Sequence, residues 1–109
     1  MAEQLSNGFG GRIPPHSVET EQALLGAMLL SSEIQTEVVG MLRPEDFYRP
    51  AHATIFDAMM ELQNNNVNFD HLSLADKLSS MQKLEAIGGQ AYLLELSGMV
   101  PVTSYWNKY

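Results

Sequence analysis

The stretch Leu42-Arg43-Pro44-Glu45-Asp46-Phe47-Tyr48-Arg49-Pro50-Ala51-His52 holds a helix stop, an aromatic pair and a helix start within eleven residues. Pro44 disfavours helical geometry at Arg43, so the preceding helix is predicted to end there. Pro50 lacks an N–H and has a fixed φ, which suits the first turn of the next helix. Phe47 and Tyr48 lie on the short connection between the two helices. We therefore expect both aromatic side chains to fill the core between these helices.

The composition is that of one globular domain. The chain has 109 residues, of which 45% are hydrophobic and 17% are charged. It carries 13 acidic and 6 basic side chains, which gives a formal charge of −7. This charge argues against a large phosphate-binding surface and favours a surface that binds a basic protein partner. The absence of cysteine excludes disulfides and thiolate metal sites. No apolar run approaches the roughly 20 residues that span a bilayer, and no secretory signal is visible, so we expect a cytoplasmic protein.

The spacing of apolar residues predicts helices throughout, after a polar, glycine-containing tail over residues 1–12 that is predicted to be disordered. Ser17 is the expected N-cap of a central first helix, and Ser32 with Gln35 forms a capping box for a second helix. A third helix is predicted from Pro50 to about Asn64. Four methionines fall on the predicted core stripes: Met28, Met41, Met59 and Met81. Met99 lies near the glycine at the end of the fifth predicted helix and is less constrained.

Two more helices, and a third that is cut short, are predicted in the second half. Asp70 is the expected N-cap of the fourth helix, and Gly88-Gly89 opens a fifth that ends near Gly98. Thr103 can cap a sixth helix, whose aromatic residues are either core or a surface covered by another part or subunit: Tyr105, Trp106 and Tyr109. Because the chain stops within this aromatic stripe, we interpret it as part of a longer protein. No strand pair or repeat is evident, so we expect an all-α fold, a compact bundle of five to six short helices.

Catalytic and metal-binding patterns are absent from the sequence. No segment fits G-x-x-x-x-G-K-[ST], the loop that cradles nucleotide phosphates. Glu45-Asp46 is expected to cap a helical turn, and His52 is interpreted as a capping or partly buried structural residue. The histidines and nearby aspartates match no ligand spacing, so no metal site is expected: His16, His52, His71, Asp46, Asp57 and Asp70.

Three blocks of this sequence together resemble the N-terminal domain of DnaB-type replicative DNA helicases. The first is Ile13-Pro14-Pro15-His16-Ser17-Val18-Glu19 with the following Glu21-Gln22-Ala23-Leu24-Leu25-Gly26. The second is the run from Arg43 to His52, and the third is Ile87-Gly88-Gly89-Gln90-Ala91-Tyr92-Leu93. The blocks come in the family's order and at its spacing. His71, Tyr105 and Trp106 depart from the residues that are usual in the family at these positions.

The resemblance implies that residues 13–109 are a helicase N-terminal, or collar, domain that is truncated in or just after its last helix. Such a domain is non-catalytic and serves ring assembly and primase docking in a hexameric helicase at the replication fork. The implied partners are the primase C-terminal domain, further copies of the domain in a dimer or hexamer collar and, as a further candidate, a helicase loader. The full-length family member is an ATP-dependent 5′–3′ DNA helicase, so ATP and Mg²⁺ are expected in a motor domain that this chain lacks.

Glu19 and Tyr92 are the residues singled out for partner contact. Glu19 lies at an exposed helix start, and the hydroxyl of Tyr92 must reach water or a hydrogen-bond partner. The alternative is that Tyr92 only packs against the first helix and Glu19 only serves the helix dipole. Phe47, Tyr48, Pro50, Gly88 and Gly89 are the candidate structural residues.

Two other functions are compatible with an all-α domain. One is a stand-alone adaptor or helicase-loading protein of the same fold, which predicts a gene that ends near residue 109. The other is a helix-turn-helix DNA-binding domain, which needs basic residues on one helix. The cations are instead scattered along the chain: Arg12, Arg43, Arg49, Lys77, Lys83 and Lys108.

Overall fold

The computed structural model describes residues 18–99, and within them it contains helices and no strand. The elements are α1 (Val18–Leu30), α2 (Ser32–Val39), the 3-10 turn η1 (Pro44–Asp46), α3 (Pro50–Asn64), α4 (His71–Ser80), α5 (Leu84–Ile87) and α6 (Gly89–Ser97). The all-α class is therefore confirmed. The tail over residues 1–12, the Ser17 cap and the Thr103 helix with its aromatic residues lie outside the described residues.

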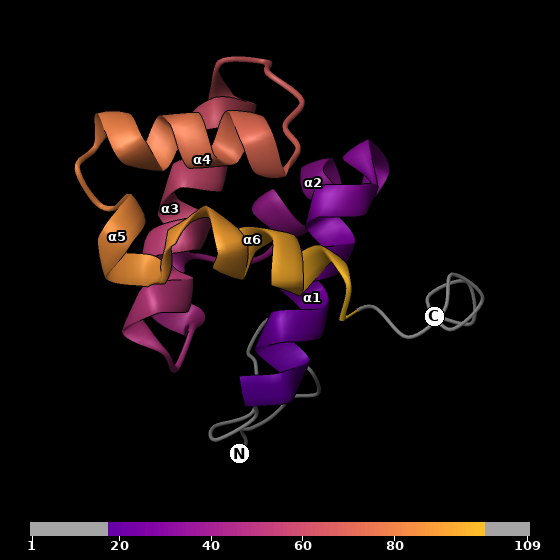
Figure 1. The fold of residues 1–109 in the computed structure, drawn as a ribbon. Helices are drawn as coiled ribbons and strands as arrows, with labels where there is room; N and C mark the ends of the chain where they lie inside the picture. Colours follow the sequence, from indigo (N-terminus) through magenta and orange to yellow (C-terminus); the bar gives the residue numbers. More distant parts are fainter. Residues whose placement is uncertain (1–17, 100–109) are drawn as a thin grey trace.

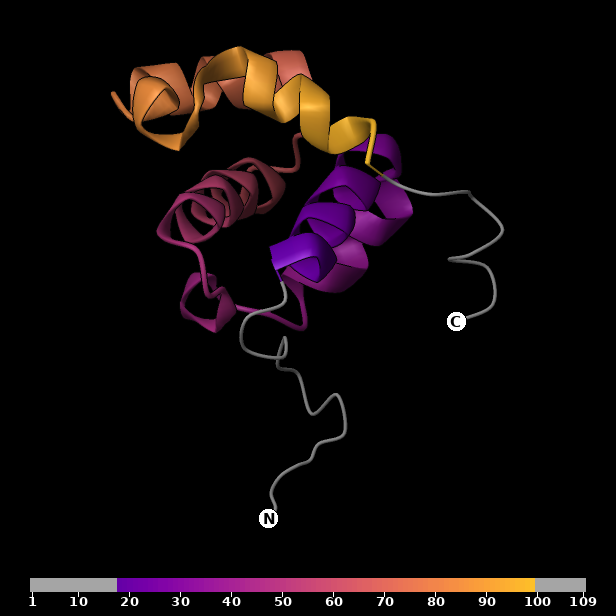
Figure 2. The same ribbon diagram turned by 60° about the horizontal axis from the view of Figure 1, so that its bottom comes forward.

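The helices form two layers. Helices α4, α5 and α6 lie together on one side, and α1, α2 and α3 lie beneath them, as the turned view shows best (Figure 2). The first and last described helices, α1 and α6, pack against each other, and α1 also contacts α2 and α3 (Figure 1). Distant parts of the sequence thus meet along α1, which places this helix at the centre as predicted.

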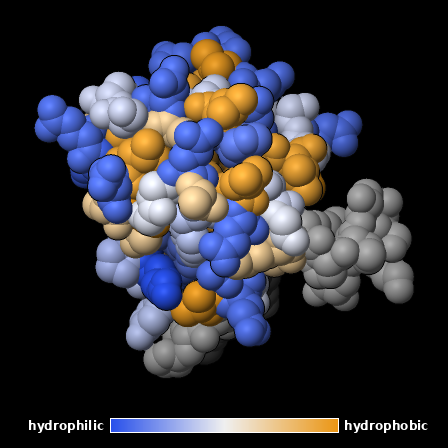
Figure 3. All heavy atoms as spheres, viewed as in Figure 1, coloured by the Kyte–Doolittle hydropathy of each residue, from blue (hydrophilic) through white to orange (hydrophobic). Residues whose placement is uncertain are grey.

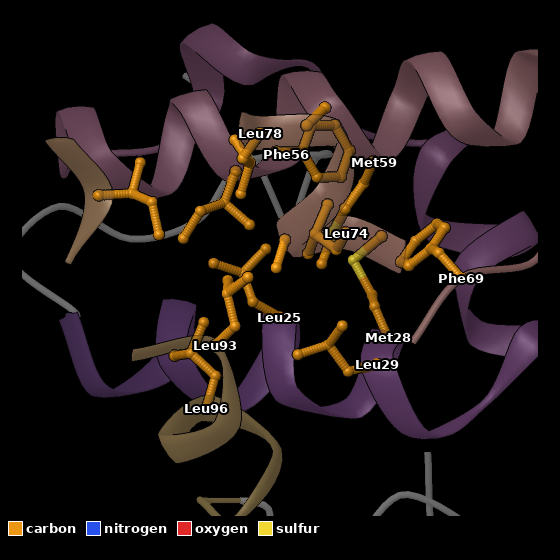
Figure 4. Packing of buried hydrophobic residues seen from close by; sticks show 14 of the residues in the cluster. Leu25, Met28, Leu29, Phe56, Met59, Phe69, Leu74, Leu78, Leu93 and Leu96 are labelled. Atoms are coloured by element: carbon orange, nitrogen blue, oxygen red, sulfur yellow. The ribbon is translucent and has the colours of Figure 1, made fainter. Parts of the chain in front are cut away.

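The core lies between the two layers and draws on α1, α3, α4 and α6 (Figure 4). Residues Leu25–Leu29 of α1 are all buried, which agrees with the central position predicted for this helix. Met41 was expected in the core, but its side chain is 52% exposed, because α2 ends at Val39 and Leu42 takes the buried position instead. Met99, which looked less constrained, is partly buried against the core.

Of the two predicted N-caps that lie within residues 18–99, Ser32 is wrong and Asp70 is confirmed. Ser31, not Ser32, caps α2: the Ser31 backbone is extended and its Oγ accepts from the Ile34 amide at 3.3 Å. Gln35 makes no capping box, because its buried side chain donates to the Met28 carbonyl at 2.7 Å and to the Phe69 carbonyl at 2.8 Å. Asp70 caps α4 as predicted, and the hydrogen bond from the Ser73 amide holds the pKa of Asp70 below its ordinary value.

The C-terminal ends of α3 and α4 are closed in the same way. Asn66 and Gln82 both adopt left-handed geometry, each with φ 61°. The next amide, that of Val67 or Lys83, bonds back to a carbonyl five residues earlier at 2.9 Å in each case. This is the Schellman arrangement, which a glycine usually provides. Here a side chain is present at both left-handed positions, and asparagine tolerates that geometry better than glutamine does.

Candidate functional site

A buried carboxylate from α1 caps the N-terminus of α3. Glu21 is 0% exposed, and its Oε2 accepts the Tyr48 amide at 2.5 Å, while Oε1 accepts the more distant Arg49 amide at 3.4 Å. Arg49, at the N-cap position of α3, makes no side-chain cap, and Pro50 follows it as the first helical residue. Glu21 therefore satisfies backbone donors that α3 cannot satisfy itself and places a negative charge at the positive end of its dipole.

The same carboxylate begins a hydrogen-bonded chain that crosses three helices. Oε1 of Glu21 lies 2.7 Å from Nδ1 of His52, which is also 0% exposed. Nε2 of His52 lies 2.6 Å from the hydroxyl oxygen of Tyr92 on α6, and Nε2 of Gln22 donates to that oxygen at 3.1 Å. Because an ionised carboxylate only accepts hydrogen bonds, Nδ1 of His52 carries a hydrogen. The four side chains form one polar network that runs from the buried Glu21 and His52 to the half-buried Gln22 and Tyr92.

Two glycines at the start of α6 have positive φ values, and Gly88 also lies close to Tyr92. Gly88 and Gly89 have φ values of 115° and 80°, which side chains rarely adopt. A Cβ atom at Gly88 would lie 3.0 Å from Cβ and 3.3 Å from Cγ of Tyr92. The structural role of both glycines stays a prediction, which the positive φ values support and, for Gly88, the close contact with Tyr92.

The aromatic pair divides between core and surface. Phe47 is 7% exposed and its ring centroid lies 4.9 Å from that of Phe56, so its predicted burial is confirmed. The prediction for Tyr48 was wrong, because its side chain is 56% exposed. The backbone is extended at Phe47, where successive side chains point to opposite sides. With Phe47 turned into the core, Tyr48 turns outward, and Glu21 holds the Tyr48 amide instead.

The structure brings Glu19 and Tyr92 to the same end of the molecule without joining them. Glu19 is exposed in the first turn of α1, and Tyr92 is half-buried. Gln22, which bonds to Tyr92, lies three residues after Glu19, a spacing that places two side chains on one helix face. Their contact with a partner stays a prediction. The structure does give Tyr92 the internal role that was its alternative, since the hydroxyl bonds to α1 and α3.

Glu21 and His52 are the residues that sequence reasoning undervalued. Glu21 lies in the first turn of its own helix, α1, but its carboxylate serves the N-terminus of α3. A signal was present: Glu21 precedes Leu25 by four residues and Met28 by seven, so it lies on an apolar stripe. A charged residue on a buried face needs a partner, and His52 occupies the matching position four residues before Phe56.

Other site types are not evident in the described part of the chain. Residues 18–99 hold no group of three or more His, Cys, Asp or Glu side chains that could bind a metal ion. No helix among them is long and apolar enough to cross a membrane. Exposed apolar side chains on the α6 face form separate groups among hydrophilic ones (Figure 3).

Comparisons with known proteins agree on one family. Residues 13–109 match the model of the DnaB-like helicase N-terminal domain. Over 105 residues the chain is 41% identical to the replicative DNA helicase DnaB of Geobacillus stearothermophilus, covering 96% of this chain and 23% of that helicase. Over 99 residues it is 39% identical to the replicative DNA helicase DnaB of Mycobacterium leprae, covering 91% of this chain and 16% of that helicase.

The structural comparison gives the same result. The crystal structure of the N-terminal domain of DnaB helicase from Mycobacterium tuberculosis matches with a TM-score of 0.77 and 40% sequence identity. The match covers 83% of this chain and 62% of that one. The chain spans less than a quarter of the length of the curated relatives named above.

Proposed function

Because the chain belongs to the family of DnaB-like helicase N-terminal domains, we propose that it is a non-catalytic assembly and docking module of a hexameric replicative helicase. The observation that carries the proposal is the match of nearly the whole chain to less than a quarter of each helicase. The family resemblance read from the three sequence blocks is thereby confirmed. ATP and Mg²⁺ belong, in this proposal, to a motor domain elsewhere in the helicase, since no phosphate-binding loop occurs in these 109 residues.

The proposed partner is the C-terminal domain of primase. A domain with a formal charge of −7 suits a basic partner surface. Glu19 offers an exposed carboxylate and Tyr92 a half-buried ring at the same end of the molecule. Because the hydroxyl of Tyr92 bonds to His52 and Gln22, we expect its ring rather than its oxygen to provide most of the contact.

Docking and self-association together give the domain its role at the fork. Copies of the domain associate into a collar over the motor ring, with a helicase loader as a further candidate partner. The collar holds primase close to the emerging single strand, so priming depends on a high effective concentration rather than on free diffusion.

The docking surface can be tested by calorimetric titration of the primase C-terminal domain into full-length helicase hexamers. Tyr92→Ala removes an aromatic anchor of the kind that costs about 2 kcal/mol or more at an interface. Glu19→Lys should weaken binding less, and mainly at low ionic strength, because charges at an interface rim are screened by salt.

Three controls make the titration specific. Glu85→Lys makes the same charge change at an exposed first-turn position of α5 and should leave affinity unchanged. Tyr92→Phe keeps the ring and should lose less affinity than Tyr92→Ala. Thermal melts check the fold of every hexamer. Wild-type affinity in folded Tyr92→Ala and Glu19→Lys hexamers would place the primase site on another surface.

A further inference from the structure

The hydrogen-bonded chain through the core has one fixed end and one adjustable end. At the fixed end, the Glu21 carboxylate accepts from two backbone amides and from Nδ1 of His52. At the other end, Gln22 can only donate to the Tyr92 oxygen through its Nε2. The direction of the remaining bond, between Nε2 of His52 and the Tyr92 hydroxyl, depends on the protonation state of His52.

With neutral His52, the hydrogen bonds that join Glu21, His52 and the Tyr92 hydroxyl are all made within the domain. The hydrogen on Nδ1 bonds to Glu21, so Nε2 has a lone pair and accepts the Tyr92 O–H at 2.6 Å. The Tyr92 oxygen in turn accepts the Gln22 amide at 3.1 Å. The tyrosine hydroxyl then has no hydrogen to offer outside the domain.

Protonation of His52 reverses this bond. Nε2 becomes a donor, so the Tyr92 oxygen receives hydrogens from both His52 and Gln22, and its own hydrogen must turn toward another acceptor. Tyr92 and Gln22 are half-buried, whereas His52 and Glu21 are fully buried, so the network reaches the surface at Tyr92 and Gln22. The Glu21 carboxylate already lies 2.7 Å from the ring that would carry the positive charge.

Among the described residues, Glu21 and Tyr92 are the titratable side chains that bond to His52. Those on the other elements packed against α3 bond to other groups or are exposed, except for His71, which is half-buried in the first turn of α4. Lys77 of α4 bonds to Glu61, nine residues beyond His52, and Asp46 of η1 bonds to the Arg43 amide. The remaining charged side chains of α2, η1 and α5 are exposed: Glu33, Glu37, Glu45 and Glu85.

We propose that His52 is a proton-controlled switch that sets whether the Tyr92 hydroxyl donates inward to the core or outward to solvent or a partner. Histidine is the side chain suited to this, because its charge ordinarily changes between about pH 5 and 8. The switch concerns the domain's own hydrogen bonds and operates whether or not Tyr92 contacts primase. Through this switch, the buried pair of Glu21 and His52 controls whether the half-buried Tyr92 has a hydrogen to donate at the surface.

The test is nuclear magnetic resonance of the isotopically labelled chain between about pH 8 and pH 5. At the upper limit the His52 ring should carry its hydrogen on Nδ1 alone, and on acidification Nε2 should gain one while the chain stays folded. The Tyr92 ring carbon that bears the hydroxyl, and the backbone amides around it on α6, should shift with the same midpoint. Hydrogen on Nε2 at the upper limit, or a His52 ring that keeps one state while the chain is folded, would overturn the proposal.

Matched variants separate the switch from an indirect effect of acid. His71→Gln removes another histidine, on the first turn of α4, and should leave the Tyr92 response intact. His52→Gln should abolish it. If that variant does not fold, Tyr92→Phe keeps the ring but removes the hydroxyl, and the α6 amides should no longer follow the titration of His52. A full α6 response in folded Tyr92→Phe would show that the hydroxyl is not the coupled group.

Discussion

At the scale of single residues, Glu21 shows how a buried charge can be tolerated by its surroundings. Removal of a carboxylate from water is costly unless hydrogen-bond donors replace the lost hydration. Here three N–H groups do so: two from the backbone at the start of α3 and one from the His52 ring. Glu21 is therefore a polar residue with a structural role, and its contribution to the stability of the fold depends on all three donors being in place.

Replacement of Glu21 by glutamine tests this dependence. The variant keeps the shape but turns one oxygen into an N–H group that faces other N–H groups. Loss of one partner of a buried pair typically costs about 3–5 kcal/mol, so we expect a decrease of roughly that size in the free energy of unfolding of Glu21→Gln. Urea denaturation measures it, with Glu19→Gln as the exposed control, expected within about 0.5 kcal/mol of wild type. Similar losses in both variants would contradict the capping role.

Phe47 and Tyr48 form a second matched pair at this scale. Phe47→Ala should lose about 3–5 kcal/mol of stability, because it leaves a cavity beside the Phe56 ring. Tyr48→Ala should lose far less, since its side chain is more than half exposed. Both variants can be compared by the midpoint of chemical denaturation. Equal shifts would mean that the tyrosine ring contributes as much to stability as the buried phenylalanine.

At the scale of helices, the sequence predicts elements well wherever their ends carry chemical signals. Pro50 and the asparagines near residue 64 bound α3 where the structure has it, and Asp70 caps α4. The helical turn expected at Glu45-Asp46 is present as η1, where the Asp46 side chain accepts the Arg43 amide, whereas α5 was missed because its four residues are too few to show a helical period.

The candidate site was harder to predict than the helices. The prediction placed a tyrosine beside a glycine break but missed the network behind it. Glu21 and His52 are 31 residues apart, and spacing along the chain does not reveal which distant partner a buried charge meets. Ser31 and Ser32 are both good caps, so the choice between them depends on packing that the local sequence does not contain.

Left-handed ends of helices offer a test at this scale. Gln82 closes α4 at φ 61°, where a side chain is strained and glycine is not. Gln82→Gly should therefore raise the free energy of unfolding by about 0.5–1 kcal/mol. Asn66→Gly, at the same φ after α3, should gain less, because asparagine tolerates this geometry. Thermal or urea denaturation ranks the two, and a loss of stability in Gln82→Gly would show that its side chain is needed.

At the scale of the whole molecule, the 109 residues form a bundle with a surplus of acidic side chains and no phosphate-binding loop. Within residues 18–99, the described interactions pack six α-helices together and cap their ends. Its polar core network is linked to the surface through Tyr92. This organisation suits a domain that positions other proteins.

The purified chain should neither hydrolyse ATP nor unwind DNA. The reason is the missing loop for nucleotide phosphates, and the net charge of −7 also disfavours tight binding to DNA. Phosphate release and strand-separation assays check this, with a full-length replicative helicase as the positive control. ATP turnover that co-purifies with the chain and disappears after a point substitution within it would contradict the prediction.

The packing of α1 against α6 has a consequence for synthesis on the ribosome. The bond between Gln22 and Tyr92 joins residues 70 positions apart, so α1 leaves the ribosome long before its final neighbour exists. At about 5–20 residues per second, translation takes roughly 4–14 seconds to add that stretch. Meanwhile the apolar face of α1 and the carboxylate of Glu21 lack their final cover. The nascent chain thus passes through a period in which a chaperone can bind its first helix.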